Sequence, residues 1–380
     1  MKSSTVYFAD FRCSDAENLQ AKFTRLMKTA GMGKIDFTDR FTAIKMHFGE
    51  VGNMAYLRPN WAKTVADFVK ERGGRPFLTD ANTLYVGKRK HALDHLEIAY
   101  ENGFSPFATG CHVIVADGLK GTDDVAVPLP DGKYVKEAFI GRAIVDADVV
   151  ISLTHFKLHE MTGIGGAIKN LGMGCGSRAG KKAMHSSVHP TVHPELCVGC
   201  GKCTRECAHG ACTLVASAKP GRAVAPRPPR LARIDAAKCV GCGRCIGACN
   251  RDAIESDFGE PCTVMQGKIA EYAAAAVRGK PNFHLSFITD VAPFCDCHPM
   301  NDAPVVANIG MLASADPVAL DQACADLVNA APALPGSALE GLRRGADKFT
   351  AMHPATRWRE AIAEGERMGL GTAKYVLKKI

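Results

Sequence analysis

Two runs of cysteines near the middle of the chain, CVGCGKCTREC and CVGCGRCIGAC, constrain its fold more than any other feature of the sequence. In each run, successive cysteines follow one another at intervals of three, three and four residues. Four thiolates at this spacing are typical of a loop that holds a [4Fe–4S] cluster, and the intervening glycines let the backbone approach a cluster closely. The predicted ligands of two clusters are Cys197, Cys200, Cys203, Cys207, Cys239, Cys242, Cys245 and Cys249.

The duplication of the run also predicts how the ligands are shared. In two-cluster ferredoxins, the fourth cysteine of each run binds the cluster of the other run. We therefore expect Cys249 to complete the cluster of the first run and Cys207 to complete that of the second. Zinc is the alternative, but a zinc ion needs only four thiolates, and eight in two matched sets fit it poorly. Ala208 and Asn250 replace the proline that usually follows the fourth cysteine, which leaves the number of ligands unchanged.

The chain has 380 residues, far more than the roughly 60–70 residues of a ferredoxin unit. Strand-like and helix-like segments alternate on both sides of the cysteine runs, which predicts a mostly parallel, doubly wound α/β sheet with helices on both faces. We expect an α/β domain formed by residues 1–190 and 258–380. A ferredoxin-like module with two [4Fe–4S] clusters interrupts it at residues 191–257.

Apolar periodicity and capping residues give the expected elements. The predicted strands are Thr5–Ala9, Phe41–Phe48, Arg75–Thr79, His112–Asp117, Asp148–Leu153, Phe283–Thr289 and Val305–Ile309. The predicted helices are Asp15–Ala30 (capped by Ser14), Pro59–Arg72, Arg89–Asn102, Ala167–Leu171, Thr263–Arg278 and Pro317–Ala330. Two further helical pieces are expected in the last stretch of about forty residues.

The charge of the chain gives little indication of its partners. The formal net charge is +8, but two oxidised clusters with their thiolates would each contribute about −2, which leaves too little excess to indicate nucleic-acid binding. The start, MKSSTVYFAD, lacks the apolar stretch of a signal peptide, and no apolar run is long enough to span a membrane. We expect a cytoplasmic protein in a reducing environment, without a membrane or nucleic-acid partner.

The segment that connects the two cysteine runs contains a stretch rich in proline and arginine, AKPGRAVAPRPPRLAR, at residues 218–233. One interpretation is a solvated loop stiffened by its prolines. The other is a docking patch for an acidic electron carrier such as ferredoxin or flavodoxin, because surface arginines attract acidic partners.

Residues Thr154–Pro190 combine glycine, lysine and histidine after a predicted buried strand, where open α/β sheets place their ligands. Free N–H groups at a helix start bind anions, and histidine titrates near neutral pH. The residues predicted to bind an anionic small molecule or cofactor are Lys157, Gly165, Gly166, Lys169, Asn170, Arg178 and Lys182. The candidate catalytic residues are His47, His159, His185 and Cys175, with an inert buried thiol as the alternative for Cys175.

A second candidate site lies in the sequence PFCDCHPMNDAP. Cys295 and Cys297 alternate as on a strand, so both thiols face one side, and His298 is adjacent. With another ligand these three residues would hold an additional metal; the alternative is a pair of thiols packed beneath the cluster module. Because polar residues such as His47, Glu50 and Asp80 also lie at or just past the ends of predicted strands, we expect all these groups to line one crevice near a cluster.

The motifs KMHFGE, LTDANTLY, THFKLHEMTGIGGAIKNLGMGCGSRAGKK, CDC and SADPVALD, together with the cysteine runs, resemble the family of uncharacterised iron–sulfur centre proteins over nearly the whole chain. That family combines an α/β domain of unknown function with an inserted two-cluster ferredoxin module. The resemblance therefore implies this fold and a role in redox chemistry or electron delivery. Asn308 stands where the family pattern has an acidic residue, so a site that includes this position would be altered here.

Three functions remain open at this point. The first is an oxidoreductase, in which two clusters relay electrons to a substrate or cofactor in the α/β pocket. The second is an electron-transfer protein without substrate chemistry of its own. The third is a factor for metal or cofactor maturation that uses Cys295, Cys297 and His298. The many titratable groups expected in the pocket favour the oxidoreductase, because a plain carrier needs none.

Overall fold

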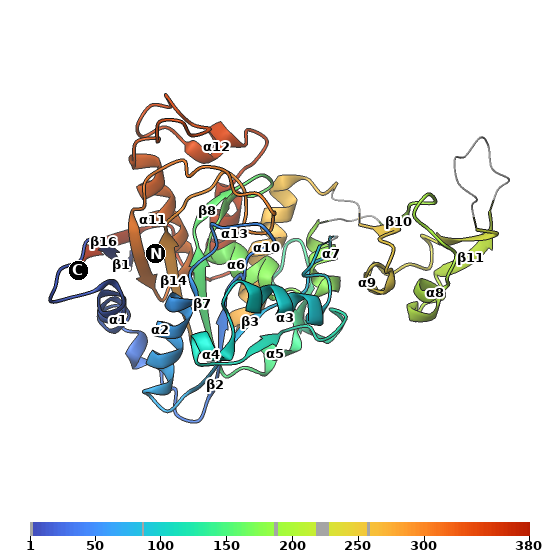
Figure 1. Cartoon of the computed structure of the whole chain (residues 1–380), viewed down its shortest axis with the longest axis horizontal. Coiled ribbons are helices and arrows are strands. Elements are labelled where there is room, and N and C mark those ends of the chain that lie inside the picture. The colour runs from blue at the N-terminus through green and yellow to red at the C-terminus, as the bar shows by residue number, and fades with distance from the viewer. Residues whose placement is uncertain (1–2, 86, 186–188, 218–227, 257–258) are drawn as a thin grey trace.

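The computed structural model describes residues 3–85, 87–185, 189–217, 228–256 and 259–380 (Figure 1). Its centre is a sheet of eight strands, of which seven run in one direction and one runs against them. The prediction of a mostly parallel sheet in an α/β fold is thus confirmed. In spatial order the strands are β16 (Tyr375–Lys379), β1 (Ser4–Asp10), the reversed β15 (Gly310–Ser314), β14 (Asn282–Ile288), β7 (Val149–His155), β2 (Phe41–Lys45), β3 (Arg75–Asp80) and β4 (Val113–Val115).

Helices cover both faces of the sheet. The first face carries α1 (Leu19–Thr29), α2 (Pro59–Lys70), α3 (Ala92–Glu101) and α4 (Pro106–Thr109), with a short 3-10 turn at Met32–Lys34. The second carries α5 (Arg142–Asp146), α6 (Ala167–Cys175), α10 (Cys262–Val277), α11 (Pro317–Ala330) and α13 (Arg359–Arg367). The remaining elements of this part are α7 (Arg178–His185), α12 (Lys348–Met352) and the ladders β5–β6 (Asp124–Pro128, Glu137–Gly141) and β8–β9 (Lys157–His159, Gly163–Gly165).

Alternating side chains of the central strands feed two separate cores. Ala43 and Val150 pack into the core of the second face, whereas their neighbours Ile44 and Ile151 pack into the core of the first. All four side chains are fully buried, because both faces of the sheet are covered. The central strands therefore consist largely of apolar residues, and the polar groups gather where these strands end.

The cysteine runs lie in a smaller set of elements that Figure 1 shows projecting from the side of the α/β domain near α7. Two short helices, one in each run, and two small antiparallel ladders make up this part. Its elements are β10 (Thr191–Val192), α8 (Lys202–Glu206), β11 (Cys212–Ala216), β12 (Arg230–Ile234), α9 (Arg244–Ala248) and β13 (Ile254–Glu255). Residues 218–227 of the predicted docking patch lie outside the described residues.

Three expectations about individual elements are wrong. Val305–Ile309 is not a strand; the strand begins at Gly310, and the apolar pattern arises because Val305 and Val306 are buried in the core from a loop. The C-terminal region contains the two expected helical pieces but ends in the edge strand β16, whose side chains are mostly exposed and carry little apolar pattern. Helix α1 is capped by Asn18 rather than Ser14, since the Asn18 side chain accepts from the N–H of Ala21.

Among the described residues, no helix has the length and apolar character needed to cross a membrane.

Candidate functional site

A cavity of about 600 Å³ opens at the carboxyl ends of the parallel strands β2, β3 and β7. The expectation that polar residues after successive strands converge on one crevice is confirmed, although they come from distant parts of the chain. The predicted residues that line the cavity are His47, Glu50, Asp80, Lys157, His159, Gly165, Gly166, Lys169, Asn170, His185, Cys295, Cys297 and His298.

Lys45, the last residue of β2, is buried in the cavity wall in an ionised network. Its Nζ lies 2.9 Å from Oδ1 of Asp80 and donates to Oδ1 of Asn170 at 2.8 Å. Burial alone would raise the pKa of Asp80, but the nearby Lys45 and His47 outweigh it, and the pKa is lowered. Gly174 on α6 leaves room for the ammonium group, because a Cβ there would collide with it. Asn170 is thus engaged in holding Lys45 rather than free to contact a ligand.

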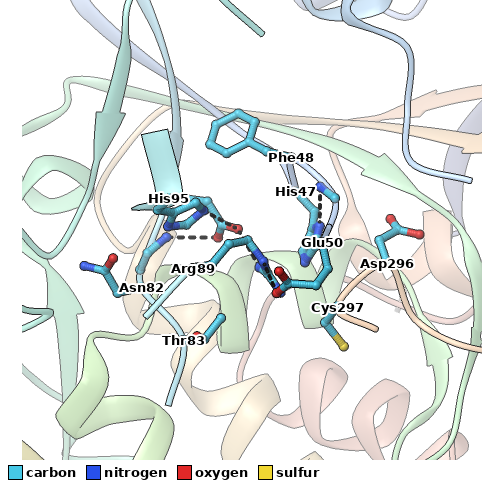
Figure 2. A network of polar contacts seen from close by, with 12 residues as sticks. His47, Phe48, Glu50, Asn82, Thr83, Arg89, His95, Asp296 and Cys297 are labelled. Atoms are coloured by element: carbon cyan, nitrogen blue, oxygen red, sulfur yellow. Dashed lines mark hydrogen bonds and ion pairs between the residues drawn. The ribbon is translucent and has the colours of Figure 1, made fainter. Parts of the chain in front are cut away.

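A second buried ion pair joins Arg89 to Glu50 above the same strand ends. The Arg89 Nε lies 3.0 Å from Oε2 of Glu50, and Figure 2 shows the two side chains facing one another. His47 lies beside this pair, and its Nδ1 accepts a backbone N–H at 2.9 Å. Burial and the Arg89 charge lower the pKa of His47 well below its usual value, so the ring is neutral at pH 7.

Two thiols and two basic side chains meet in another part of the cavity wall. Cys295 and Cys297 lie in a turn and not on the predicted strand, since no ladder includes them. The Nζ of Lys169 lies 3.4 Å from the Cys295 sulfur, and the ligand atoms of His159, Cys295 and Cys297 all lie within 4.8 Å of one another. Burial would lower the pKa of Lys169, but the two neighbouring sulfurs outweigh it and the pKa is raised.

Glu160 and His298 close the outer edge of this group. The Nε2 of His298 lies 2.8 Å from Oε1 of Glu160, and the ligand atoms of both residues lie within 4.8 Å of the Cys297 sulfur. The bond to Glu160 raises the pKa of His298. His298 therefore lies next to the two thiols, as expected from the sequence, but it is already held by a carboxylate.

The cations of the cavity differ in whether they have an anionic partner. Lys157 lies 2.9 Å from Oδ2 of Asp296, which also contacts His155, so its charge is matched. Within the described residues, neither Lys169 nor Lys181 has a carboxylate within ion-pair distance. Burial lowers the pKa of Lys181 to about 8. These two lysines are positive charges that an anionic ligand in this cavity would meet, and the exposed Lys88 also lines the cavity.

The prediction that free N–H groups at the start of α6 bind an anionic ligand is wrong. Gly165 and Gly166 line the cavity, but the carboxylate of Asp321 already caps the helix. It accepts from the N–H groups of Ala167 at 2.6 Å and Ile168 at 2.9 Å. Gly166 is needed because a Cβ there would collide with this carboxylate. The chain thus supplies its own carboxyl group at the helix start, from Asp321 of α11.

Asp321 predicts a pH dependence of stability. Burial raises its pKa from 3.8 to about 7, so between these values the folded protein keeps a proton that the unfolded chain has lost. Stability therefore falls as the pH rises through this window, by up to about 1.4 kcal/mol per unit. Urea unfolding at several pH values from about 5.5 to 7.5 should show this fall, and Asp321→Asn should remove it. An equal slope in both proteins would contradict the assignment.

Arg178 and Lys182 do not line the cavity, in contrast to the prediction. Arg178 donates from Nε to the carbonyl of Lys120 at 3.0 Å. Its guanidinium packs against Gly247 of the second cysteine run, so closely that a Cβ at this glycine would lie 3.0 Å from it. The Nζ of Lys182 lies close to Gly241 in the same way. The two side chains instead hold the second cysteine run against the α/β domain.

Three other expected residues also lie in places that limit their roles. Cys175 is fully buried and outside the cavity lining, and burial raises its pKa to about 11, so the inert-thiol interpretation fits and the reactive one does not. His185 lines the cavity, but burial lowers its pKa to about 3, so the ring is neutral. Asn308 accepts from the N–H of Asp290 at 2.8 Å outside the cavity lining, so its change from an acidic residue does not alter this site.

The structure brings the eight run cysteines together in two groups. One small cavity is lined by Cys197, Cys200, Cys203 and Cys249. Another is lined by Cys207, Cys239, Cys242 and Cys245, together with Cys212 of β11, which lies outside the two runs. The fourth cysteine of each run thus lies with the first three of the other run, which is the grouping expected for exchanged cluster ligands.

The backbone around these cysteines is shaped alike in the two runs. Four glycines between the cysteines have left-handed φ angles that side chains disfavour, namely Gly199 (68°), Gly201 (70°), Gly241 (72°) and Gly243 (68°). Backbone N–H groups also point at three of the sulfurs: Ala232 at Cys197 (3.4 Å), Cys212 at Cys207 (3.4 Å) and Ala253 at Cys249 (3.3 Å). Such N–H donors stabilise thiolates bound to a cluster.

The spacing of the sulfurs bears on the zinc alternative. Around one zinc ion the sulfurs lie about 3.8 Å apart, because each Zn–S bond is about 2.3 Å long. In the described part of the chain, the groups of three or more candidate ligand atoms within 4.8 Å of one another include none of the eight run cysteines. The described run sulfurs are therefore not gathered as closely as the ligands of one zinc ion.

The model of the family described as Domain of unknown function (DUF362) matches residues 42–326, which is most of the chain. The chain belongs to the DUF362 family. The match supports the part of the sequence resemblance that concerns an α/β domain of unknown function. No curated protein matches this DUF362 chain.

Two solved structures are similar to parts of the DUF362 protein. The lactate racemase apoprotein from Thermoanaerobacterium thermosaccharolyticum is 15% identical, with a TM-score of 0.33, over 43% of this chain and 39% of that one. A protein from Thermotoga maritima is 12% identical, with a TM-score of 0.35, over 70% of this chain and 50% of that one. In both comparisons the chain covers half or less of the solved structure.

Sequence reasoning missed Lys45 and Arg89, two residues of the DUF362 cavity that carry its charge. Both are buried and line the cavity. For Lys45 the available signal was its position at the end of the buried strand β2. His155, Lys181 and Asp296 lie in segments that the sequence singled out, and they are also buried in or beside the cavity. A charged residue at the end of an apolar strand therefore indicates a ligand site as well as a histidine at that position does.

Proposed function

We propose that this DUF362 protein is a redox protein that carries electrons between an external carrier and an anionic ligand in the cavity. In this proposal residues 191–257 form a ferredoxin-like module that holds two [4Fe–4S] clusters. The observation that carries it is the grouping of the run cysteines into two quartets with exchanged fourth members. The left-handed glycines and the N–H groups directed at sulfur support the same assignment, because they match what a cluster needs from its loop.

Contacts between the cysteine segment and the cavity wall support electron transfer between them. Lys90, next to Arg89 of the cavity, donates to the carbonyl of Cys249 at 2.9 Å. Leu84 lines the cavity and also belongs to the apolar cluster that surrounds the run cysteines. On the other side, Lys181 lines the cavity while its neighbour Lys182 lies against the second run. Short paths of this kind favour electron transfer, which slows steeply with distance.

Each group of residues has a separate part in this proposal. The clusters, when bound, would supply one-electron redox chemistry. Lys169 and Lys181 would hold an anionic group of the ligand, because they have no carboxylate partner among the described ion pairs. The neutral ring of His47 carries its proton on Nε2, because Nδ1 accepts a backbone N–H, and this Nε2–H would donate a hydrogen bond to the ligand. The buried pairs of Lys45 and Arg89 would keep the cavity wall rigid.

The proposed external partner is an acidic electron carrier such as ferredoxin or flavodoxin. Arg230 and Arg233 are exposed on β12, on the part of the molecule that also carries the cysteine runs. Charges placed there would steer an acidic protein toward the clusters.

Metal analysis of protein purified without oxygen tests the proposal directly. We expect about eight iron and about eight acid-labile sulfides per chain, and an absorbance near 400 nm that is bleached by dithionite. Stoichiometric zinc without labile sulfide would overturn the cluster assignment.

The same preparation tests the second half of the proposal. Mass analysis of small molecules released on denaturation should find a ligand with a phosphate or carboxylate group. The double variant K169M/K181M should release none, whereas Lys63→Met, which changes an exposed lysine of α2, should retain it. Intact clusters in a protein whose ligand is unaffected by the cavity lysines would favour a plain electron carrier.

A further inference from the structure

We propose that Cys295 and Cys297 form a redox-active pair that alternates between a dithiol and a disulfide inside the cavity. The inference rests on the proposed function for the source of its electrons. It deepens that function by naming the group of the chain that would accept them. The reduced pair would act on a disulfide or another thiol-reducible group of the anionic ligand.

The turn that carries the two cysteines holds their sulfurs close together. The N–H of His298 donates to the carbonyl of Cys295 at 3.0 Å, which closes a turn with the two cysteines at its first and third positions. Both sulfurs lie within 4.8 Å of one another and line the cavity. Joining them requires the two sulfurs to approach one another to about 2 Å.

The surroundings of the two sulfurs are unequal. The ammonium of Lys169 lies 3.4 Å from the Cys295 sulfur, and Lys157 lies nearby, so a thiolate is stabilised at Cys295. The hydrogen bond to Cys295 and burial raise the pKa of Cys297, and the nearby carboxylate of Glu160 adds to this rise. A hydrogen bond from Cys297 contributes most to lowering the pKa of Cys295, burial opposes it, and Lys169 adds to the lowering. Cys295 is thus the nucleophile and Cys297 the thiol that keeps its proton.

The orientation of His159 favours a thiol pair over a metal site. Its Nδ1 accepts from the N–H groups of Met161 at 3.0 Å and Thr162 at 3.2 Å, so the proton of the neutral ring is on Nε2. A histidine that binds a metal through one nitrogen normally donates a proton from the other. With Nδ1 already an acceptor, His159 is suited to donate from Nε2 to the Cys295 sulfur and not to bind a metal there.

The electron balance of the pair matches what two clusters supply. Reduction breaks the S–S bond with two electrons; one proton goes to the Cys297 sulfur, and the Cys295 sulfur remains a thiolate beside Lys169. Two one-electron centres hold the required number of electrons. In the reverse direction the pair loses two electrons and one proton as the bond forms. Attack of the Cys295 thiolate on a ligand disulfide, followed by attack of Cys297 on the mixed disulfide, would release the reduced ligand.

Peptide mass analysis of the full chain tests the pair without any activity assay. After equilibration in mixtures of reduced and oxidised dithiothreitol and acid quenching, the peptide that contains both cysteines should change by 2 Da between the two states. Cys111→Ser, which alters a buried thiol elsewhere, should show the same transition. Lys169→Met should slow alkylation of Cys295 at pH 7 on the order of tenfold, because loss of the nearby charge raises the pKa of the thiol by about one unit.

The results separate this inference from the function on which it rests. Intact clusters with no disulfide in any mixture would overturn the thiol pair alone. A reversible disulfide in protein that holds no iron would overturn the cluster function but leave the pair standing. One zinc or iron per chain that is lost in Cys295→Ser, beyond the eight irons expected of the clusters, would replace the pair with a metal site. With oxidised glutathione as the probe, the Cys297→Ser variant is expected to keep a stable mixed disulfide at Cys295, whereas its formation at Cys297 in Cys295→Ser instead would reverse the assigned roles.

Discussion

Replacement of Cys249 by serine is expected to damage the cluster of the first cysteine run, 46 to 52 residues away in sequence, and to spare the cluster of its own run. The reason is the grouping of Cys249 with Cys197, Cys200 and Cys203 in one cavity. By the same reasoning, Cys207→Ser should damage the cluster of the second run. Each variant should fall from about eight iron atoms to about four per chain.

Spectra of the reduced variants show which cluster is lost. Electron paramagnetic resonance of Cys249→Ser should match that of Cys200→Ser, and Cys207→Ser should match Cys242→Ser. The exposed thiol Cys13 offers a control, since Cys13→Ser should keep both signals. If Cys249→Ser instead matched Cys242→Ser, each run would hold its own cluster and the exchange would be disproved.

The second large effect is expected from the buried pair of Lys45 and Asp80. The substitution Asp80→Asn removes the carboxylate partner of the Lys45 ammonium. Lys45 is only 1% exposed, so its charge would stay buried without that partner. Removal of one partner from a buried pair costs about 3–5 kcal/mol of unfolding free energy. Asp80 also lies near Arg89 and His95, so the loss should fall at the upper end of this range.

An exposed pair of similar length provides the matched control. Lys63 and Asp67 of α2 lie 2.7 Å apart but are well exposed, so Asp67→Asn should cost less than about 1 kcal/mol. Urea unfolding of both variants at pH 7 measures the difference. Equal losses would show that burial of the Lys45 pair contributes nothing beyond a surface ion pair.

Features encoded in short stretches of sequence could be predicted. The repeated spacing of the cysteine runs indicated how the cysteines are grouped, and apolar strands followed by polar residues indicated the cavity. Helix α11 was predicted to the residue because Pro317 at its first turn marks its start. The convergence of His47 and Cys297 followed from a general property of parallel sheets and needed no knowledge of their contacts.

Features that depend on distant partners could not be predicted. The start of α6 looked free in sequence, but Asp321 reaches it from more than 150 residues away. Arg178 and Lys182 lie among the glycines and lysines of one segment, yet the short helix α7 turns them toward the cysteine run and leaves Lys181 in the cavity. Lys45 resembles a surface lysine until its partners are known.

The position of β1 in the sheet determines when folding of the sheet can be completed during protein synthesis. Tyr7 pairs with Ala313 in β15 on one side and with Lys378 in β16 on the other, so the first strand waits for almost the entire chain to leave the ribosome. The central strands β7 and β14 also pair across the cysteine segment. Pairing of such long range makes folding slow. Both cysteine runs therefore emerge from the ribosome while the sheet is still open, and metal can reach them before the domain beside them has formed.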